Sequence, residues 1–351
     1  MADRNDYFAQ KYRIEIEKLR SIQQELPEIC SDFFRAIEPT TSILTRLNYA
    51  YDLRLFFDFL FKQVHAFNNT VSTQIKVDDL NRVTSTDLEK FLEYISFYEK
   101  DNLVHENHEN GKARKLATLR SFYAYLFKKK LVLGNIASLL DMPKIHEKEI
   151  IRMEVDEVAK LLDQVESGNS LTKTQKKYHE YTRLRDIALL TLFLGTGIRI
   201  SECIGLDINH LDFEINGFKI TRKGGNQVIL YFSDEVRNAL LQYLKERKII
   251  LALPSHENAL FLSLQKKRIS AKAIQNLVKK YSQIITPLKR ITPHKLRSTY
   301  GTTLYRETGD IYLVADVLGH KDVNTTRKHY AAISDDKRRM AAKIVKLRDD
   351  S

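Results

Sequence analysis

The sequence predicts a mainly α-helical protein in two parts: an N-terminal helical bundle, and a C-terminal mixed α/β domain that is helical with a small antiparallel sheet. Three observations lead to this expectation. Apolar residues recur at helical spacing over residues 41–130, the pattern of helices that bury one face. A short polar stretch with a proline interrupts that periodicity at 141–151. Beyond it, helical segments flank one pair of β-type runs.

Length and composition set the outer limits. The chain has 351 residues, 43% hydrophobic and 29% charged, which excludes disordered and collagen-like classes and leaves room for two domains. No stretch approaches the ~20 apolar residues of a membrane span, and residues 1–12 do not resemble a secretion signal. Cys30 and Cys203 supply neither a disulfide framework nor a zinc ligand set. We therefore expect a folded, cytoplasmic protein without a membrane anchor.

The N-terminal part is expected to consist of four or five helices. Residues 53–61 carry apolar side chains on one helix face, and Thr41 or Ser42 is a candidate N-cap for that helix. A second helix is expected to begin near Ser85 or Thr86, and a third to span about 111–130. No glycine turn or alternating pattern interrupts this region, so we expect a helical bundle.

The third of these helices is strongly basic. Residues 111–130 contain seven Lys and Arg residues and no acid, with aromatic residues interleaved, whereas residues 76–110 are rich in acidic residues. One interpretation lays this helix on DNA phosphates through Lys112, Lys115 and Arg120. The alternative is a solvated helix face beside an apolar stripe. His105 and His108, just before this helix, are expected in an exposed polar loop rather than at a metal site.

The net charge of +12 is unevenly distributed. Residues 1–150 carry 22 basic and 22 acidic side chains, so the whole excess lies in residues 151–351. A concentrated positive charge of this kind favours a polyanionic partner for the C-terminal part, although many basic proteins never bind nucleic acid.

The C-terminal part begins after a predicted linker at 143–151. Helices are expected over 155–163 and 183–194, and again from 236 onwards. Between them, residues 214–232 form two β-type runs around Gly224 and Gly225, which predicts a hairpin. This part should therefore be helical with a small sheet.

Several polar residues of this part stand in distinctive local sequences. Arg199 follows two glycines in LGTGIRISE, and His294 and Arg297 lie three apart in TPHKLRSTY, on one face if that segment is helical. His320 ends LGH, and Tyr330 follows ten residues later. Lys223 stands at the edge of the predicted hairpin. Taken singly, each of these residues is more easily explained as solvated or structural.

Taken together, these motifs resemble the tyrosine recombinase (phage integrase) family, and among its members the Xer-type recombinases most. TGIRISE, TRKGG, TPHKLRST, LGH and the following tyrosine occur in the family's order over about residues 152–335. One departure is Ser298, where many members have a second histidine. The resemblance implies the following parts: leader 1–27, core-binding (SAM-like) DNA-binding domain 28–142, linker 143–151, catalytic domain 152–335, and a tail helix 336–351 that docks on a neighbouring subunit.

The resemblance also implies the roles of the site residues. Tyr330 would be the nucleophile that forms a covalent 3′-phosphotyrosyl bond, His294 its proton acceptor, His320 a hydrogen-bond donor to the phosphate, and Lys223 the proton donor to the leaving 5′-oxygen. The chemistry is consistent with this. Two arginine forks, Arg199 and Arg297, can bind the phosphoryl oxygens bidentately without a metal ion. Tyr300, Tyr305 and Tyr312 are rival nucleophiles, but their positions favour helix packing, and none follows LGH at the family's interval.

The implied function is site-specific DNA recombination through a Holliday junction, with a role like that of Xer recombinases in resolving chromosome dimers. The expected partners are double-stranded DNA with a specific recombination site and three further copies of the chain in a tetramer. The sequence does not say whether an activating partner protein takes part. No cofactor, metal or ATP is expected. Alternatives are the integrase of a mobile element, a type IB topoisomerase-like enzyme, and a non-catalytic DNA-binding protein.

Overall fold

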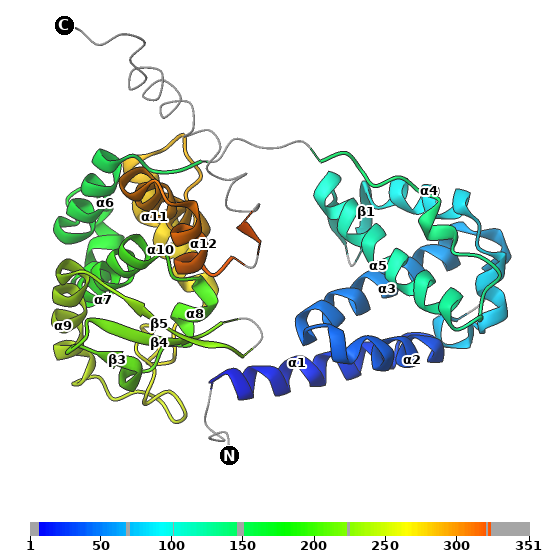
Figure 1. Ribbon diagram of the computed structural model, residues 1–351, viewed down its shortest axis with the longest axis horizontal. Helices are drawn as coiled ribbons and strands as arrows, with labels where there is room; N and C mark the ends of the chain where they lie inside the picture. The colour runs from blue at the N-terminus through cyan, green and yellow to red at the C-terminus, as the bar shows by residue number, and fades with distance from the viewer. Residues whose placement is uncertain are drawn as a thin grey trace, which may run out of the picture. The chain divides into compact units, whose positions relative to one another are not determined.

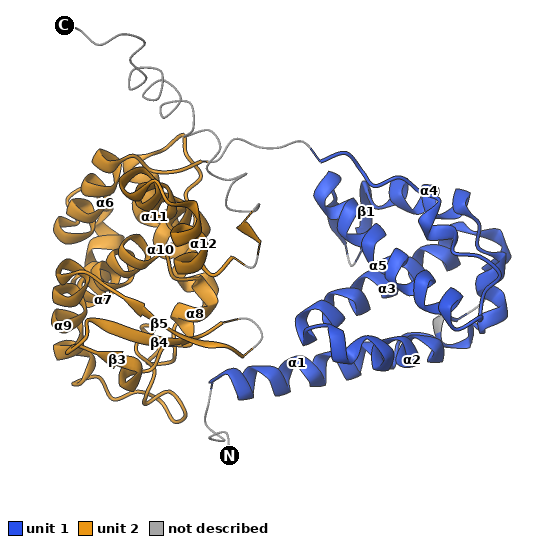
Figure 2. Ribbon diagram, in the orientation of Figure 1, with its two compact units in different colours: residues 1–148 blue, residues 149–351 orange. Residues whose placement is uncertain are grey.

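The computed structural model describes residues 7–67, 71–100, 102–145, 151–222, 225–320 and 322–323. The chain divides into two units, residues 1–148 and residues 149–351 (Figure 2). Most residues of both units are helical, and each unit adds one small antiparallel sheet (Figure 1). The predicted fold class is therefore confirmed. No helix within the described ranges is long and apolar enough to cross a membrane.

Within its described residues, unit 1 contains five α-helices and one β-hairpin. The elements are α1 (Tyr7–Gln23), α2 (Glu28–Ile37), α3 (Ile43–Gln63), α4 (Ser85–Tyr94), β1 (Phe97–Lys100), β2 (Leu103–Glu106) and α5 (Glu109–Lys128).

Helix α3 is the centre of unit 1. It begins where the sequence predicts, because the Ser42 side chain accepts a hydrogen bond from the Thr45 backbone N–H at 3.2 Å. Phe56, Phe57 and Leu60 are completely buried. Since burying one such side chain contributes about 1.5–3 kcal/mol, this apolar stripe holds the neighbouring helices together.

Helix α1 belongs to the same core. Its residues Leu19 and Ile22 are buried in the cluster that contains the apolar residues of α3, and the two helices pack against each other. The segment predicted as a leader, 1–27, thus contributes a helix to unit 1 in its described part.

The β1–β2 hairpin corrects the expectation that the N-terminal part is purely helical. Its strands pair antiparallel, with Phe97 opposite Glu106 and Lys100 opposite Leu103. Asn102 has a φ of 58°, a left-handed conformation that asparagine tolerates, so the strands turn without a glycine. His105 therefore lies in a strand, its ring stacked on Tyr98 at 5.0 Å, and not in a loop.

Unit 2 contains seven α-helices and a three-stranded sheet in the part of the chain that the structure describes. The elements are α6 (Val155–Ser167), α7 (Lys173–Thr196), α8 (Ile200–Ile204), β3 (Leu211–Asp212), β4 (Gly217–Thr221), β5 (Gln227–Tyr231), α9 (Asp234–Arg247), α10 (Ala271–Ile285), α11 (Pro293–Thr308) and α12 (Ile311–Leu318).

Helix α7 is the central element of unit 2. Its second half is buried almost all round, with Leu189, Leu190 and Phe193 inaccessible to solvent, and it packs against α6, α9 and α11. Burial on every side is why this segment lacks a simple amphipathic pattern.

The predicted hairpin is present as β4 and β5. Gly217 pairs with Tyr231 and Thr221 with Gln227, and β3 adds a two-residue strand on the other side of β4. The Arg222 backbone N–H donates to the Asn226 carbonyl at 2.8 Å, which closes the turn at the end of the ladder. The strand order β3–β4–β5 leaves the β5 edge of the sheet unpaired within the described ranges.

Candidate active site

Arg199 occupies the N-cap position of α8. Its backbone N–H donates to Glu202 Oε2 at 2.9 Å, and its Nη1 donates to Glu202 Oε1 at 2.9 Å. Glu202 is buried, whereas 34% of the Arg199 side chain remains exposed. One carboxylate thus fixes both the backbone and the guanidinium of Arg199, and leaves part of the guanidinium accessible.

Arg297 lies in α11 and is buried, with 5% of its surface exposed. The helix begins with Pro293 and is capped by Thr292, whose side chain accepts the Lys295 backbone N–H. Arg297 Nη1 donates to the Gly197 carbonyl and Nη2 to the Leu318 carbonyl. The guanidinium therefore joins the end of α7 to the end of α12.

Gly197 makes this junction possible. It ends α7 in the left-handed conformation, with a φ of 61°. A β-carbon on Gly197 would lie 2.5 Å from Tyr300 Cδ1 and 2.9 Å from Leu318 Cδ2. Only glycine fits both the backbone conformation and the space.

Three arginine side chains converge on the C-terminal end of α12. Arg222 Nη2 donates to the Val317 carbonyl at 2.8 Å, Arg297 donates to the Leu318 carbonyl, and Arg199 Nη2 donates to the Gly319 carbonyl at 2.8 Å. The last carbonyls of a helix lack partners within the helix and carry its negative partial charge. They thus gather three guanidinium groups from α8, α11 and the β4–β5 hairpin, and this concentration of fixed positive charge suits an anion.

The two histidines of the predicted site belong to two of the segments that meet here, one on α11 and one just beyond α12. His294 is exposed and lies one turn before Arg297 in α11, so the expected helix is present. His320 follows Gly319 directly and is half-buried, and its backbone N–H donates to the Ala315 carbonyl at 2.9 Å. Figure 1 shows α11 and α12 beside each other in unit 2, in agreement with their packing contacts.

Lys223 and Tyr330 lie outside the described residues, and so do His329 and the predicted tail 336–351. Of the six predicted catalytic residues, the structure therefore joins Arg199 and Arg297 through the end of α12, and places His294 on the helix of Arg297 and His320 directly after the end of α12. The roles of all six stay predictions.

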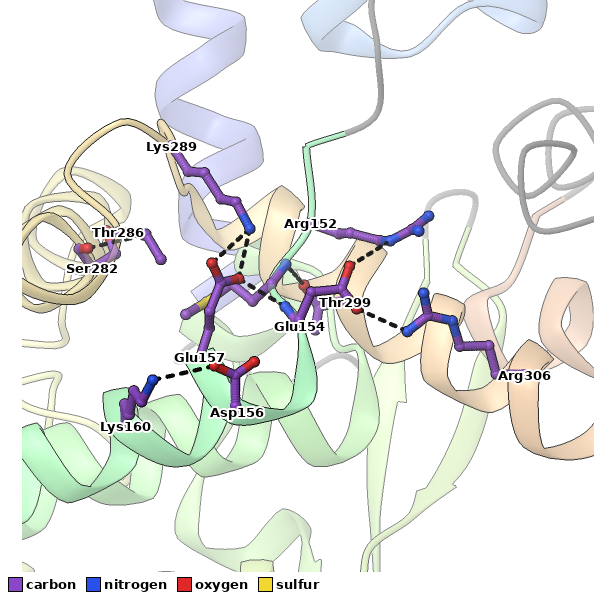
Figure 3. Close-up of polar contacts among 11 residues, drawn as sticks. Arg152, Glu154, Asp156, Glu157, Lys160, Ser282, Thr286, Lys289, Thr299 and Arg306 are labelled. Carbon is purple, nitrogen blue, oxygen red and sulfur yellow. Dashed lines mark hydrogen bonds and ion pairs between the residues drawn. The ribbon is translucent and has the colours of Figure 1, made fainter. Parts of the chain in front are cut away.

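Helix α11 is held in place by the first residues of unit 2 (Figure 3). The buried Met153 backbone N–H donates to Thr299 Oγ1 at 3.0 Å, two residues beyond Arg297. Glu154 accepts from Arg306 Nη1 at 3.0 Å, and this contact lowers the pKa of Glu154. These bonds attach the chain that follows the predicted linker to the helix that carries His294 and Arg297.

The rival tyrosines differ from one another in environment. Tyr300 and Tyr305 pack against the buried Val314 and Leu318, and burial raises the pKa of Tyr300, which makes its phenol a poorer nucleophile. Tyr312 is 71% exposed, so the packing expected from its position is wrong for this residue.

The three predicted DNA contacts on α5 have different surroundings. Lys115 is buried, with 7% exposed, and its Nζ donates to Asn107 Oδ1 at 2.6 Å. Arg120 donates to the carbonyls of Ala137 and Leu140. Lys112 is half-buried. Lys115 and Arg120 thus have structural roles that sequence reasoning missed, and a DNA contact by any of the three stays a prediction.

Arg222 is the member of this arginine cluster that sequence reasoning did not single out. The only signal available was its place beside Lys223 in TRKGG, where a second basic residue adds nothing recognisable to the pattern. Its partners Asp316 and Val317 are more than ninety residues away in the chain, so only the fold reveals them.

Comparisons with known proteins place this geometry in context. The family model described as the phage integrase family matches residues 152–337. Tyrosine recombinase XerC of Caldanaerobacter subterraneus is 35% identical over 289 residues, which cover 80% of this chain and 75% of the relative. Tyrosine recombinase XerS of Streptococcus uberis is 27% identical over 355 residues, covering 94% and 98%. A solved structure of the XerH site-specific recombinase, bound to palindromic difH substrate in a post-cleavage complex, matches with a TM-score of 0.63 at 19% identity, over 86% of this chain and 80% of that one.

Proposed function

Because the chain belongs to the phage integrase family of tyrosine recombinases, enzymes that break and rejoin DNA, we propose that its C-terminal unit performs this chemistry with Arg199, Arg297 and Tyr330 at its centre. The observation that carries the proposal is the convergence of Arg199 and Arg297 on adjacent carbonyls at the end of α12. Two guanidinium groups fixed by the fold are preorganised for the charge that spreads over the phosphoryl oxygens in the transition state.

For the remaining steps we propose the roles that the family resemblance implies, which agree with the chemistry of phosphodiester cleavage. The Tyr330 phenol, with an ordinary pKa near ~10, loses its proton to His294 as its oxygen attacks phosphorus. His320 donates a hydrogen bond to the phosphate, and Lys223 gives a proton to the departing 5′-oxygen. The enzyme then holds a 3′-phosphotyrosyl bond and the DNA a free 5′-hydroxyl.

The covalent intermediate keeps the energy of the bond that was broken. A 5′-hydroxyl from a second DNA strand attacks the phosphotyrosyl phosphorus, and the tyrosine leaves with its proton restored. Two such exchanges on one pair of strands produce a Holliday junction, and the reaction consumes no ATP. Exchange therefore needs two double-stranded DNA sites, which we propose are held by four copies of the chain.

The biological role that we propose is that of an Xer recombinase, the resolution of chromosome dimers. Relatives named XerC and XerS cover most of this chain, the XerS relative over nearly its whole length. Integration or excision of a mobile element uses identical active-site chemistry, so the geometry of the site does not distinguish the two roles.

The test begins with a binding site selected from randomised duplex DNA by the full chain. A plasmid with two copies of that site should resolve into two circles, whereas a topoisomerase-like enzyme would relax the plasmid without resolving it. A nick placed beside the cleavage position should trap a covalent protein–DNA adduct, because the short 5′ fragment diffuses away. Tyr330→Phe should give neither resolution nor adduct, and adduct formation by this variant would overturn the proposal.

The predicted tail gives a separate test of subunit assembly. Residues 336–351 contain an apolar stripe too short to be buried alone: Met340, Ile344, Val345 and Leu347. Deleting residues 335–351 should abolish cooperative binding to a two-copy site in gel-shift titrations, with the circular dichroism of the folded monomer retained. Unchanged cooperativity would reject the docking of this tail on a neighbour.

A further inference from the structure

Arg222 links the β4–β5 hairpin to the active-site end of α12. Its backbone is fixed in the hairpin: its N–H donates to the Asn226 carbonyl at 2.8 Å, and its carbonyl accepts the Gly225 N–H at 3.0 Å. Its side chain leaves the hairpin, and Nη2 donates to the Val317 carbonyl at 2.8 Å and to the Asp316 carbonyl at 3.2 Å.

The contact is closely packed. A β-carbon at Gly319 would lie 2.5 Å from Arg222 Cζ and 2.6 Å from its Nη1, so the guanidinium rests directly against the Gly319 backbone. The Arg222 Nε is buried and has no hydrogen-bond partner within the described ranges. A polar atom buried in this way costs free energy, so the side chain is held by its other contacts and by packing.

The position of this link along the chain gives it a function. The residue after Arg222 is Lys223, the proposed proton donor, and two glycines follow it. A lysine side chain has four rotatable bonds of its own. A proton donor at the end of such a side chain needs a firmly placed residue beside it in the chain. Arg222 supplies it, since its guanidinium bonds the helix end at which Arg199 and Arg297 also converge.

We propose that Arg222 is a positioning residue for the proton transfer to the leaving 5′-oxygen. It fixes the backbone that precedes Lys223 relative to the phosphate-binding arginines. This inference rests on the proposed role of Lys223 as proton donor. If Arg222 had a structural role alone, its loss would slow cleavage with any leaving group. If it positions the proton donor, its loss slows cleavage only where the leaving group needs a proton.

The experiment compares two leaving groups on the selected, nicked duplex. One substrate has the natural 5′-oxygen, and the other has sulfur at the bridging 5′ position. A thiolate is a far weaker base than an alkoxide, with a thiol pKa near ~8.5, and leaves without a proton. Single-turnover cleavage rates are measured for wild type, Arg222→Ala, Arg222→Lys and Lys223→Ala, with DNA affinity measured in parallel. Arg183→Ala, which removes an exposed arginine of α7, controls for the loss of one positive charge.

Arg222→Ala should cleave the natural substrate ~10²-fold more slowly than wild type, the scale of effect that a small misplacement of a catalytic group produces. It should bind DNA about as tightly as Arg183→Ala, which also lacks one positive charge, and cleave the sulfur substrate within about threefold of the rate of that control. Lys223→Ala should show the same recovery with sulfur. Arg222→Lys keeps the charge but not the guanidinium that bonds the Asp316 and Val317 carbonyls, so its cleavage rate on the natural substrate should lie between those of wild type and Arg222→Ala. If the alanine variant does not fold, the same comparison of the two substrates is made with Arg222→Lys.

Two results separate the failure of this inference from the failure of the proposed function. If Lys223→Ala recovers with sulfur and Arg222→Ala does not, or if Arg222→Ala cleaves the natural substrate at the wild-type rate, Arg222 is not a positioning residue for this step. If Lys223→Ala itself gains nothing from sulfur, Lys223 is not the proton donor, and the proposed function fails in that step.

Discussion

Replacing Gly197 by alanine tests how tightly the fold holds the two phosphate-binding arginines together. Gly197 ends α7 with a φ of 61°, and its carbonyl accepts a hydrogen bond from Arg297. Arg199 lies two residues further along the chain. The new methyl group would meet Tyr300 Cδ1 at 2.5 Å and Leu318 Cδ2 at 2.9 Å. Tyr300 belongs to α11 and Leu318 to α12, so relief of these contacts must displace one or both helices.

The magnitude follows from two contributions. Placing a non-glycine residue in the left-handed region costs about 1–2 kcal/mol, and forcing a methyl group into a filled space costs about 1–3 kcal/mol. Together they should lower the free energy of unfolding by about 2–5 kcal/mol, a large part of the ~5–15 kcal/mol that a typical protein possesses.

The assay is urea unfolding followed by far-UV circular dichroism, because the chain contains no tryptophan. Gly225→Ala is the matched control: Gly225 also has a positive φ, 86°, but no atom lies within 4 Å of a β-carbon there, so only backbone strain is added. Combining Gly197→Ala with Tyr300→Ala should recover about 1–2 kcal/mol through loss of the clash. The reasoning is refuted if Gly197→Ala is as stable as wild type, or if it costs the same with and without the Tyr300 ring.

The other predictions concern the arginines and the support of α11. Arg199→Ala and Arg297→Ala should bind the selected duplex in gel shifts, yet lose about 3–4 kcal/mol of transition-state stabilisation in single-turnover cleavage; cleavage at the wild-type rate would contradict the clamp. Thr299→Val leaves the buried Met153 N–H without its acceptor, so urea unfolding should show a loss of about 1–3 kcal/mol, and no loss would mean that this bond contributes nothing. Arg306→Ala should lower the melting temperature at pH 7. Since the Arg306 contact lowers the pKa of Glu154, the advantage of wild type is fully present above the ordinary carboxyl pKa of ~4.3 and is lost as the pH falls from there through the lowered pKa; a gap in melting temperature that does not shrink on acidification would contradict this.

Much of the fold could be predicted because local rules decide it. Ser42 begins α3 as its sequence implies, and the apolar spacing of residues 53–61 gives the buried face of that helix. The β4–β5 hairpin follows from two β-type runs around a glycine pair. In each case the signal lies within a few residues of the structure that it specifies.

Interactions between distant residues were not predictable in this way. The β1–β2 hairpin turns with Asn102 at a positive φ instead of a glycine, so its sequence carries no strong turn signal. The buried Lys115 has two polar partners: its Nζ donates to Asn107, and the Asp52 carboxylate on α3 favours its charged form. Burial lowers the pKa of Lys115, and Asp52 opposes that shift. A charge pattern along one helix cannot reveal such partners.

In the candidate site, too, the sequence reveals local motifs but not the contacts between distant residues. Sequence motifs supplied Arg199, His294, Arg297 and His320 one by one, whereas the common attachment of Arg199 and Arg297 to the end of α12 depends on backbone carbonyls. Every residue has a carbonyl, so carbonyl partners leave no mark in the sequence. For this reason Arg222, whose side chain donates to two carbonyls of α12, becomes visible in the folded chain alone.

The central claim is that a phenol near the carboxyl end attacks a phosphorus held by Arg199 and Arg297. Mass spectrometry of the covalent adduct tests it most directly: wild-type protein is trapped on the nicked duplex, digested with nuclease and protease, and the modified peptide is sequenced. The account predicts a nucleotide attached to Tyr330 and to no other residue. Attachment to Tyr300, Tyr305 or Tyr312, or no adduct on a substrate that the protein binds, would contradict it.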